Sequence, residues 1–411
     1  MMAAILPVPA QSGVAGGPPP AAAADLTIIG GGPVGMALAL LLARDAREPG
    51  RIVLCAAERA AGAAAADPRV LALNHGSRVL LQALGAWPAG GADILDIHVS
   101  QRGRLGRTHI SHSDFGVPAL GTVVRYGALA DALAQAVARS GVAVRHGTAR
   151  IAAQEESVVL VEQDGAGWPT AVCVQAEGGA FGEQARGDVH RRYGQHAVLG
   201  SVLAARPRAG WAWERFTREG PLALLPYPAA PGAAPDPRRH ALVWCCAPDR
   251  AQALCALDDA AFAHELNHAF GERLGRLAPA GPRHASPLGM NLRREPVHGR
   301  AVAIGNAAQT LHPVAGQGLN LGLRDAARLA QTLAPWLNAT AGDPRPALAR
   351  YAAARRADRW LTAGLTDFLP RVFASGLPPV EHAAGLALLA LDASAALRRP
   401  LARHLLQGLR A

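Results

Sequence analysis

The segment most suited to chemistry is the stretch 300–325, where an apolar run leads into a glycine-rich turn and then an amphipathic pattern. The pattern predicts a buried strand, a loop and a helix that begins near Leu319. Glycines let the backbone approach a ligand closely, and a helix start presents N–H groups without intrahelical partners. Such a start stabilises negative charge, as on the N1–C2=O edge of a reduced flavin ring. A tight turn without a ligand is the alternative. The predicted ring contacts are Gly316, Gln317, Gly318, Leu319 and Asn320.

Another glycine motif lies near the other end of the sequence; it is the first in chain order, and the stretch 300–325 is the second. An apolar strand runs into Gly30-x-Gly32-x-x-Gly35, and an Ala/Leu-rich helix follows with Pro33 and Val34 in its first turn. The first glycine permits the turn, the second lets a pyrophosphate touch the backbone, and the third lets the helix pack on the strand. Because the strand and the helix are both in place, the motif predicts dinucleotide binding by these five residues.

The acid that usually binds the ribose of such a dinucleotide is less clear in this chain. The next apolar strand, 51–57, ends at Glu58, roughly the expected 20 residues beyond the glycines. Glu58 is therefore either the ribose ligand or a solvated charge at the end of a strand.

Together the two glycine motifs resemble those of the FAD-dependent aromatic hydroxylases, and in particular the ubiquinone-biosynthesis hydroxylases of the 2-polyprenyl-6-methoxyphenol hydroxylase type. The resemblance extends over nearly the whole chain after about residue 25, and further family-like stretches are 67–73, 213–226 and 351–359. It implies bound FAD, NAD(P)H as a transient reductant, and hydroxylation of a polyprenyl phenol by dioxygen through a flavin C4a-hydroperoxide. It also implies that other ubiquinone-biosynthesis proteins are candidate partners.

The resemblance also assigns roles to single residues. Arg69 matches an arginine beside the flavin, with a surface loop charge as the alternative, and Arg125 and Tyr126 compete for a second FAD contact. Glu177 and Gly178 occupy the place of an acid-glycine turn near the ribose and pyrophosphate.

In the second motif, Asn306 stands where the wider flavoprotein group has an aspartate that binds the ribityl chain. His312 and Pro313 are expected over the flavin face as the catalytic pair, although His312 could also be purely structural. Asp325 stays unassigned, and the sequence singles out no general base.

Composition limits the classes of function. The 411 residues suffice for two lobes, and the net charge of +10 comes from arginines that are scattered rather than clustered. No aromatic-basic module is present, so no nucleic-acid partner is expected. An anionic membrane surface and a compositional bias toward arginine both explain the charge. Five cysteines without a CxxC pair indicate reduced thiols and a cytoplasmic location, with contact to the inner face of the cell membrane left open.

We expect an α/β (α+β overall) fold: a Rossmann-like FAD-binding lobe, an antiparallel substrate lobe and C-terminal helices. The Ala/Pro/Gly-rich residues 1–24 are expected to be a disordered tail without a signal peptide. The expected domains are an FAD-binding domain at 25–196 and 281–340, in which 94–120 contribute to the substrate side, a substrate domain at 197–280, and a helical region at 341–411.

Two remaining features have competing interpretations. The apolar segment 385–391, followed by Arg398, Arg399 and Arg403, is either a membrane-surface helix or an ordinary buried one. His264-Glu265-x-x-His268 matches a zinc motif, but no third ligand follows at a suitable spacing, and we expect no metal. Two functions compete with ubiquinone-pathway hydroxylation: hydroxylation of a small soluble aromatic compound, and a non-catalytic flavin-binding scaffold.

Overall fold

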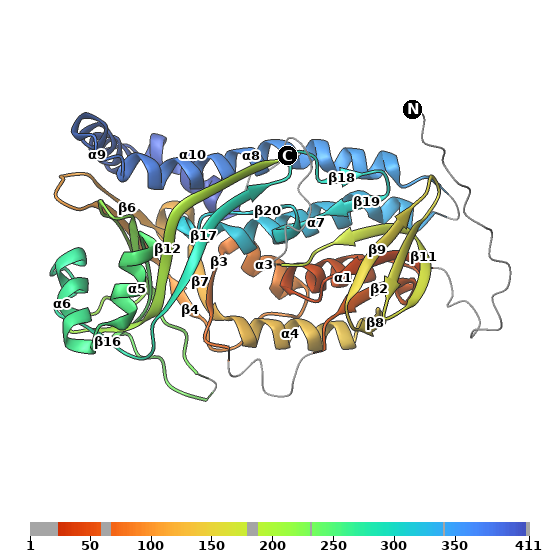
Figure 1. Ribbon diagram of the computed structural model, residues 1–411, viewed down its shortest axis with the longest axis horizontal. Helices are drawn as coiled ribbons and strands as arrows, with labels where there is room; N and C mark the ends of the chain where they lie inside the picture. The colour runs from red at the N-terminus through yellow and green to blue at the C-terminus, as the bar shows by residue number, and fades with distance from the viewer. Residues whose placement is uncertain (1–23, 59–66, 179–187, 231, 340–341, 408–411) are drawn as a thin grey trace, which may run out of the picture.

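A computed structural model of the protein describes residues 24–58, 67–178, 188–230, 232–339 and 342–407, so the expected tail lies outside the described residues except for Ala24. Two large sheets lie side by side, and a long helix, α8, runs along the top of the view in Figure 1 across both of them. The expected mixed α/β class is confirmed.

The first sheet has eight strands within the described residues, and parallel pairing joins its centre in the order β19-β11-β1-β2-β8. An antiparallel extension adds β9 and β10 beside β11, and β18 pairs with β19. The strands are β1 (Ala24–Ile29), β2 (Ile52–Ala56), β8 (Ala143–His146), β9 (Ala149–Gln154), β10 (Val159–Gln163), β11 (Ala166–Gln175), β18 (Val297–His298) and β19 (Ala301–Ala303).

Three helices cover one face of this sheet and form the largest apolar core with it. They are α1 (Pro33–Asp45), α4 (Tyr126–Ala138) and α7 (Gln317–Leu337). Almost every residue of α1 is buried, as expected for a helix that is apolar on all sides. Helix α7 begins at Gln317, two residues before the predicted start, and its start lies beside the turn that leads into α1.

The second sheet has nine strands within the described residues, in the order β20-β17-β12-β15-β14-β13-β5-β6, with β16 beside β12. Its outer face packs on α5 (Pro248–Ala256) and α6 (Asp259–Phe270) around Trp244 and Phe262. The strands are β5 (Asp96–Gln101), β6 (Arg107–Ser111), β12 (Val189–Ala204), β13 (Trp211–Phe216), β14 (Pro221–Pro226), β15 (Arg239–Cys246), β16 (Leu277–Pro279), β17 (His284–Leu292) and β20 (Gln309–Thr310).

A small third sheet connects the two lobes, in the order β3 (Val70–Asn74), β7 (Gly121–Arg125) and β4 (Ala92–Ile94). The helix α3 (His75–Ala83) follows β3 directly, and the Asn74 side chain caps it by accepting a hydrogen bond from the Ser77 N–H. The strand β3 forms through antiparallel pairing with β7, about 50 residues away, so its local sequence does not predict it.

The remaining helices pack across both lobes. They are α8 (Arg345–Phe373), α9 (Pro378–Ala393) and α10 (Ala395–Gln407). Among the described helices, none alone has the length and apolar character of a membrane span, whereas α9 and α10 together would have both but bend by 98° at their junction.

The sheet pairing divides the lobes differently from the expected domains. Strand β12 begins at Val189 and crosses the expected boundary at 196/197, and β17, expected in the FAD-binding domain, pairs along β12 in the second sheet. Within the segment 94–120, β5 and β6 also belong to the second sheet. Because pairing between distant strands decides which sheet a segment joins, composition alone could not place these boundaries.

Candidate functional site

The first glycine motif forms a close-packed corner between β1 and α1. A Cβ atom added at Gly35 would lie 2.0 Å from the carbonyl oxygen of Gly30, and one added at Gly30 would lie 2.7 Å from the Glu177 nitrogen. Gly30 also has a φ of +120°, a conformation that residues with side chains rarely adopt. These contacts explain the glycines and place the turn at 176–178 directly against the motif.

The second glycine motif packs on the first. A Cβ atom added at Gly305 would lie 3.2 Å from the Val34 side chain, and one added at Gly322 would lie 2.8 Å from the same side chain. Gly178 lies near Asn306, since its added Cβ atom would be 3.7 Å from the Asn306 amide nitrogen. Segments almost 300 residues apart in the sequence therefore form one continuous site.

This site has open space beside two helix starts, and we name this space the cradle. A Cβ atom added at Gly32 or Gly318 would meet nothing within 4 Å, so the backbone faces open space at both helix starts. Gly32 is the N-cap of α1, and no side chain caps that helix. Uncapped N–H groups beside open space are the arrangement that binds the pyrophosphate of FAD. Pro33 and Val34 are buried in the first turn of α1 and shape this start.

The acidic candidates lie at the edge of the cradle. Glu58 is exposed just beyond the end of β2, and Glu177 is exposed where β11 ends beside Gly30. Desolvation raises the pKa of the Glu177 carboxyl. Both positions are compatible with contacts to the ribose of FAD, and their roles stay predictions.

The arginine candidates are engaged with the protein itself. The guanidinium of Arg69 pairs with Asp67 at 2.6 Å and lies 3.9 Å from the centre of the Tyr126 ring. The Arg125 Nε donates to the carbonyl of Ala229 at 3.2 Å. Arg69 and Tyr126 thus stack on each other. A change at one of these predicted FAD contacts would therefore also move the other.

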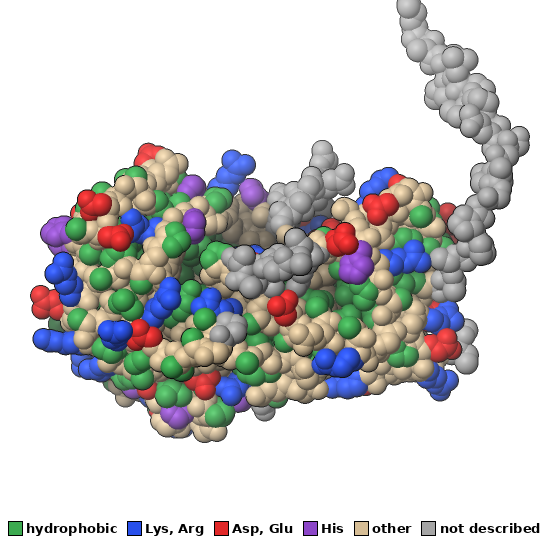
Figure 2. All heavy atoms as spheres, turned by 90° about the horizontal axis from the view of Figure 1, so that it is seen from below, with side chains coloured by type: hydrophobic (Ala, Val, Ile, Leu, Met, Phe, Trp, Pro, Cys, Tyr) green, Lys and Arg blue, Asp and Glu red, His purple; other side chains and the backbone are tan. Residues whose placement is uncertain are grey.

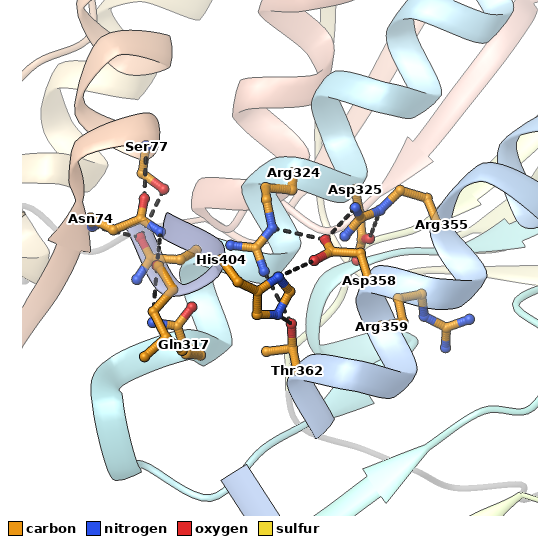
Figure 3. Close-up of polar contacts among 12 residues, drawn as sticks. Asn74, Ser77, Gln317, Arg324, Asp325, Arg355, Asp358, Arg359, Thr362 and His404 are labelled. Carbon is orange, nitrogen blue, oxygen red and sulfur yellow. Dashed lines mark hydrogen bonds and ion pairs between the residues drawn. The ribbon is translucent and has the colours of Figure 1, made fainter. Parts of the chain in front are cut away.

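Asn320 ties the start of α7 to the third sheet (Figure 3 shows this region). Its Oδ1 accepts hydrogen bonds from the Asn74 N–H at 2.9 Å and the Ser77 hydroxyl at 2.7 Å. Its Nδ2 donates to the carbonyls of Ala72 and Gly316. All four hydrogen-bonding positions of the side chain are therefore occupied by the protein, so the amide holds the loop in place. A contact of Asn320 with the flavin ring stays a prediction.

The other residues of this loop are positioned from both sides. Gly316 is the left-handed N-cap of α7, with a φ of +58°, and a Cβ atom there would lie 3.2 Å from that of Ala72. Gln317 is buried and donates to the carbonyl of Leu405 in α10 at 3.4 Å. Leu319 packs on the main apolar core, while Gly318 faces the open space of the cradle.

His312 is completely buried in the loop between β20 and α7. Its Nδ1 accepts a hydrogen bond from the Val314 N–H at 3.2 Å, and its ring meets the edge of Tyr193 at 5.0 Å between centroids. Desolvation lowers the pKa of His312 to about 4, so the imidazole is neutral at neutral pH. The Nε2 has no hydrogen-bond partner among the described residues. Pro313 follows as the N-cap of a short 3-10 turn at Val314–Gly316.

Asp325, which the sequence left unassigned, joins this loop to the long helices (Figure 3). Its Oδ2 accepts hydrogen bonds from the Gly305 N–H at 3.3 Å and from Gln309 Nε2 at 2.5 Å. Its Oδ1 pairs with Arg355 of α8 at 2.8 Å. This function of Asp325 depends on the distant helix α8 and was therefore not evident from its local sequence.

The zinc-like motif, His264-Glu265-x-x-His268, lies on α6, which covers the outer face of the second sheet. Its Glu265 pairs with Arg250 at 2.5 Å, and this pairing lowers the pKa of the carboxyl. In the part of the chain that the structure describes, no group of three or more His, Cys, Asp or Glu side chains is arranged to hold a metal ion.

The chain is similar to known proteins in both sequence and fold. A family profile described as FAD binding domain matches residues 195–363. The chain is 33% identical to ubiquinone hydroxylase UbiL of Rhodospirillum rubrum over 96% of this chain and 95% of the relative. It is 31% identical to 3-demethoxyubiquinol 3-hydroxylase of Escherichia coli over 93% of this chain and 98% of the relative. Among solved structures, p-nitrophenol 4-monooxygenase PnpA of Pseudomonas putida DLL-E4 has the same fold, with a TM-score of 0.71, 15% identity, and coverage of 95% of this chain and 99% of that one.

Proposed function

The chain belongs to the ubiquinone-biosynthesis hydroxylases, a family of FAD-dependent monooxygenases, and on this basis we propose that it hydroxylates the ring of a polyprenyl phenol. Dioxygen is the second substrate, and NAD(P)H is the transient reductant. When bound, FAD supplies the oxygen-activating chemistry, and the protein binds, orients and shields the reactants. Other proteins of ubiquinone biosynthesis are candidate partners.

An apolar cluster beside the loop 305–316, which we name the flavin loop, supports the proposal of a polyprenyl substrate. Val314, from this loop, packs with Phe216 of the second sheet, the proposed substrate sheet, and with Phe373 of α8. The two phenyl rings are stacked at 4.1 Å between centroids. Ala384 and Leu388 of α9 complete the cluster. These five side chains are buried against one another. We propose that the isoprenoid chain packs beside this cluster, because its affinity comes from burial of apolar area.

The same apolar character continues outward along the C-terminal helices. Large apolar side chains are exposed on α8 and α9 and in the segment between them: Trp360, Leu361, Phe368, Leu377, Val380 and Leu386. This continuity favours a substrate with a long apolar tail over a small soluble aromatic compound, for which a compact polar pocket would be expected.

We further propose that this exposed apolar surface contacts the inner face of the cell membrane while the rest of the protein stays in the cytoplasm. Arg399 and Arg403 are exposed on the neighbouring helix α10 and would complement anionic lipid headgroups. The face in Figure 2, which lies away from α8, instead shows arginines interspersed with acidic and apolar side chains.

The chain's own residues have separable tasks in this reaction. The turns at Gly32 and Glu177–Gly178 would hold the ADP portion of FAD, and Asn306 would meet the ribityl chain. The helix start at Gly316–Gly318 would stabilise negative charge on the reduced ring. His312 and Pro313 would shape the site over the ring.

Reaction of the FAD-loaded protein with prenylated phenols tests the proposal. We expect NAD(P)H oxidation to be stimulated by a 2-prenylated phenol and to yield a product heavier by one oxygen atom, detected by mass spectrometry. Catalytic efficiency should increase with the length of the prenyl chain, and Phe373→Leu should reduce this dependence. Equal activity on unprenylated benzoate-type acids would favour the small-substrate alternative, and FAD binding without any hydroxylation would favour the scaffold.

A further inference from the structure

Glu214 is a carboxylate on the inner face of the substrate sheet, the face that the flavin loop approaches. On β13, Trp211 and Trp213 pack with the outer core beneath α5 and α6. Side chains alternate along a strand, so Ala212, Glu214 and Phe216 project to the opposite face. The contacts of Ala212 and Phe216, which lie in inner clusters rather than the outer core, agree with this alternation.

Both neighbours of Glu214 on this face connect to the flavin loop. Phe216 packs with Val314 inside the loop. Ala212 belongs to a cluster against which Ala72 packs, and Ala72 is the residue that a side chain at Gly316 would touch. Glu214 lies between these two contacts, so its carboxylate is on the section of the sheet that faces Pro313–Gly316.

The surroundings of this carboxylate are apolar. Its partners across the strands are Val99 of β5 and Ala223 of β14. The side chain is partly buried, and among the described residues it has neither a hydrogen bond nor an ion pair. Desolvation raises the pKa of Glu214 to about 7, and no charged group offsets this shift. A carboxylate held in this way has no structural partner and is available to a ligand.

We infer that Glu214 is the catalytic base that accepts the proton of the substrate phenol, a role that rests on the proposed function. The phenol O–H bond breaks, an O–H bond forms on the Glu214 carboxylate, and the electron pair stays on the phenol oxygen. The ring thereby becomes electron-rich at the carbons that receive oxygen. A base that titrates near the working pH is suited to this transfer.

The other ionisable groups near this face are less suited to the role. The pKa of His312 is near 4, which makes it a weaker base, and its Nδ1 already accepts a hydrogen bond. Burial raises the pKa of Tyr193 and of Cys245, a thiol influenced by the Glu214 charge, so both stay protonated at neutral pH. Arg215, the next residue on β13, projects to the outer face, where Gly271 lies near its guanidinium.

The test compares Glu214→Gln and Glu214→Asp with Glu219→Gln in FAD-loaded enzyme. Glu219 is an exposed carboxylate five residues away that pairs with Arg250, so its change controls for loss of an acid. We expect Glu214→Gln to lower kcat about 100-fold at neutral pH with bound FAD unchanged. Glu214→Asp should retain more activity, and Glu219→Gln should match the original chain.

Two readouts separate a base from a structural residue. The rate of the original chain should rise with pH through about 7, because Glu214 acts when ionised, and Glu214→Gln should lose this rise. A ring-fluorinated prenyl phenol, whose O–H is more acidic, should restore much of the rate of Glu214→Gln. An unchanged pH profile in Glu214→Gln, or an equal deficit with both phenols, would overturn the inference. Failure of the unaltered chain to hydroxylate either phenol would instead overturn the proposed function.

Discussion

Asp325 and Arg355 form a buried ion pair behind the flavin loop, with Arg355 Nε 2.8 Å from Asp325 Oδ1. Because the second carboxylate oxygen binds the Gly305 N–H and Gln309, one side chain joins α7, α8 and the loop. Arg355 also pairs with Asp358, which in turn pairs with Arg324. Burial alone would raise the pKa of Asp358, but the two arginines together lower it. The polar network thus holds the loop from the side of α7 and α8.

Replacement of Asp325 tests this support. Asp325→Asn removes the charge that balances Arg355 and should lower the free energy of unfolding by about 3 kcal/mol, measured by urea denaturation. The control Glu162→Gln removes the carboxylate of the exposed Arg150–Glu162 pair and should change it by less than about 1 kcal/mol. Equal small changes in both variants would show that the buried pair contributes little.

Gly32 offers a way to separate cofactor binding from folding. Its φ is −77° and an added Cβ atom meets nothing within 4 Å, so Gly32→Ala should leave the stability of the FAD-free protein within about 1 kcal/mol. The methyl group would occupy space that we assign to the pyrophosphate, and FAD affinity should fall at least about tenfold. Fluorescence titration with FAD measures this, and unchanged affinity would place the cofactor elsewhere.

The contrasting variant is Gly35→Ala. Its added Cβ atom would lie 2.0 Å from the Gly30 carbonyl oxygen, so the corner itself must shift. We expect Gly35→Ala to lower the stability of the FAD-free protein as well as FAD affinity, whereas Gly32→Ala lowers only the second.

The buried imidazole of His312 predicts a pH dependence of stability. Its pKa falls from 6.5 when unfolded to about 4 when folded, so the unfolded state binds more protons between these values. The free energy of unfolding should therefore decrease as the pH falls from 6.5 to about 4, with His312 contributing on the order of 3 kcal/mol. His312→Asn should flatten this slope in urea titrations. His98, whose pKa is also lowered to about 4, adds a similar slope, so His98→Asn is the matched comparison.

Membrane contact is tested by replacing apolar side chains on the exposed surface of α8 and α9 with charged ones. Phe368 and Leu386 are 57% and 66% exposed, and the double variant Phe368→Glu/Leu386→Glu should weaken binding to anionic liposomes at least about tenfold. The control Leu160→Glu places the same charge at an exposed position of strand β10, in the other lobe and away from this surface. Equal liposome binding by all three proteins in a sedimentation assay would contradict the proposed surface.

The sequence was most informative where local pattern and local structure coincide. The corner at Gly30–Gly35 and the loop at 305–320 each combine a strand, a turn and a helix within about 20 residues, so spacing alone identified them. Their mutual contact, in which Gly305 and Gly322 lie against Val34, joins segments far apart in the chain and could not be predicted from spacing. The contacts of single residues with FAD stay predictions.

Features that depend on distant pairing could not be predicted in the same way. Strand β3 forms against β7, and β17 joins the substrate sheet through β12, about 90 residues away. Glu214 was part of a family-like segment, yet nothing local showed that its carboxylate would be left without a partner opposite the flavin loop. The hydrogen bonds that engage the Asn320 amide also come partly from the distant strand β3 and helix α3, so the local sequence did not show them.

The carbonyl of Leu405 in α10 accepts hydrogen bonds from Asn74 and from Gln317, and so secures both sides of the cofactor loop. Asn74 precedes Leu405 by 331 positions. During synthesis, the lobes can begin to fold as they leave the ribosome. The two hydrogen bonds to the Leu405 carbonyl cannot form until residue 405 has been translated. FAD should therefore bind only after translation is nearly complete. Nascent chains stalled before α10 should retain FAD poorly.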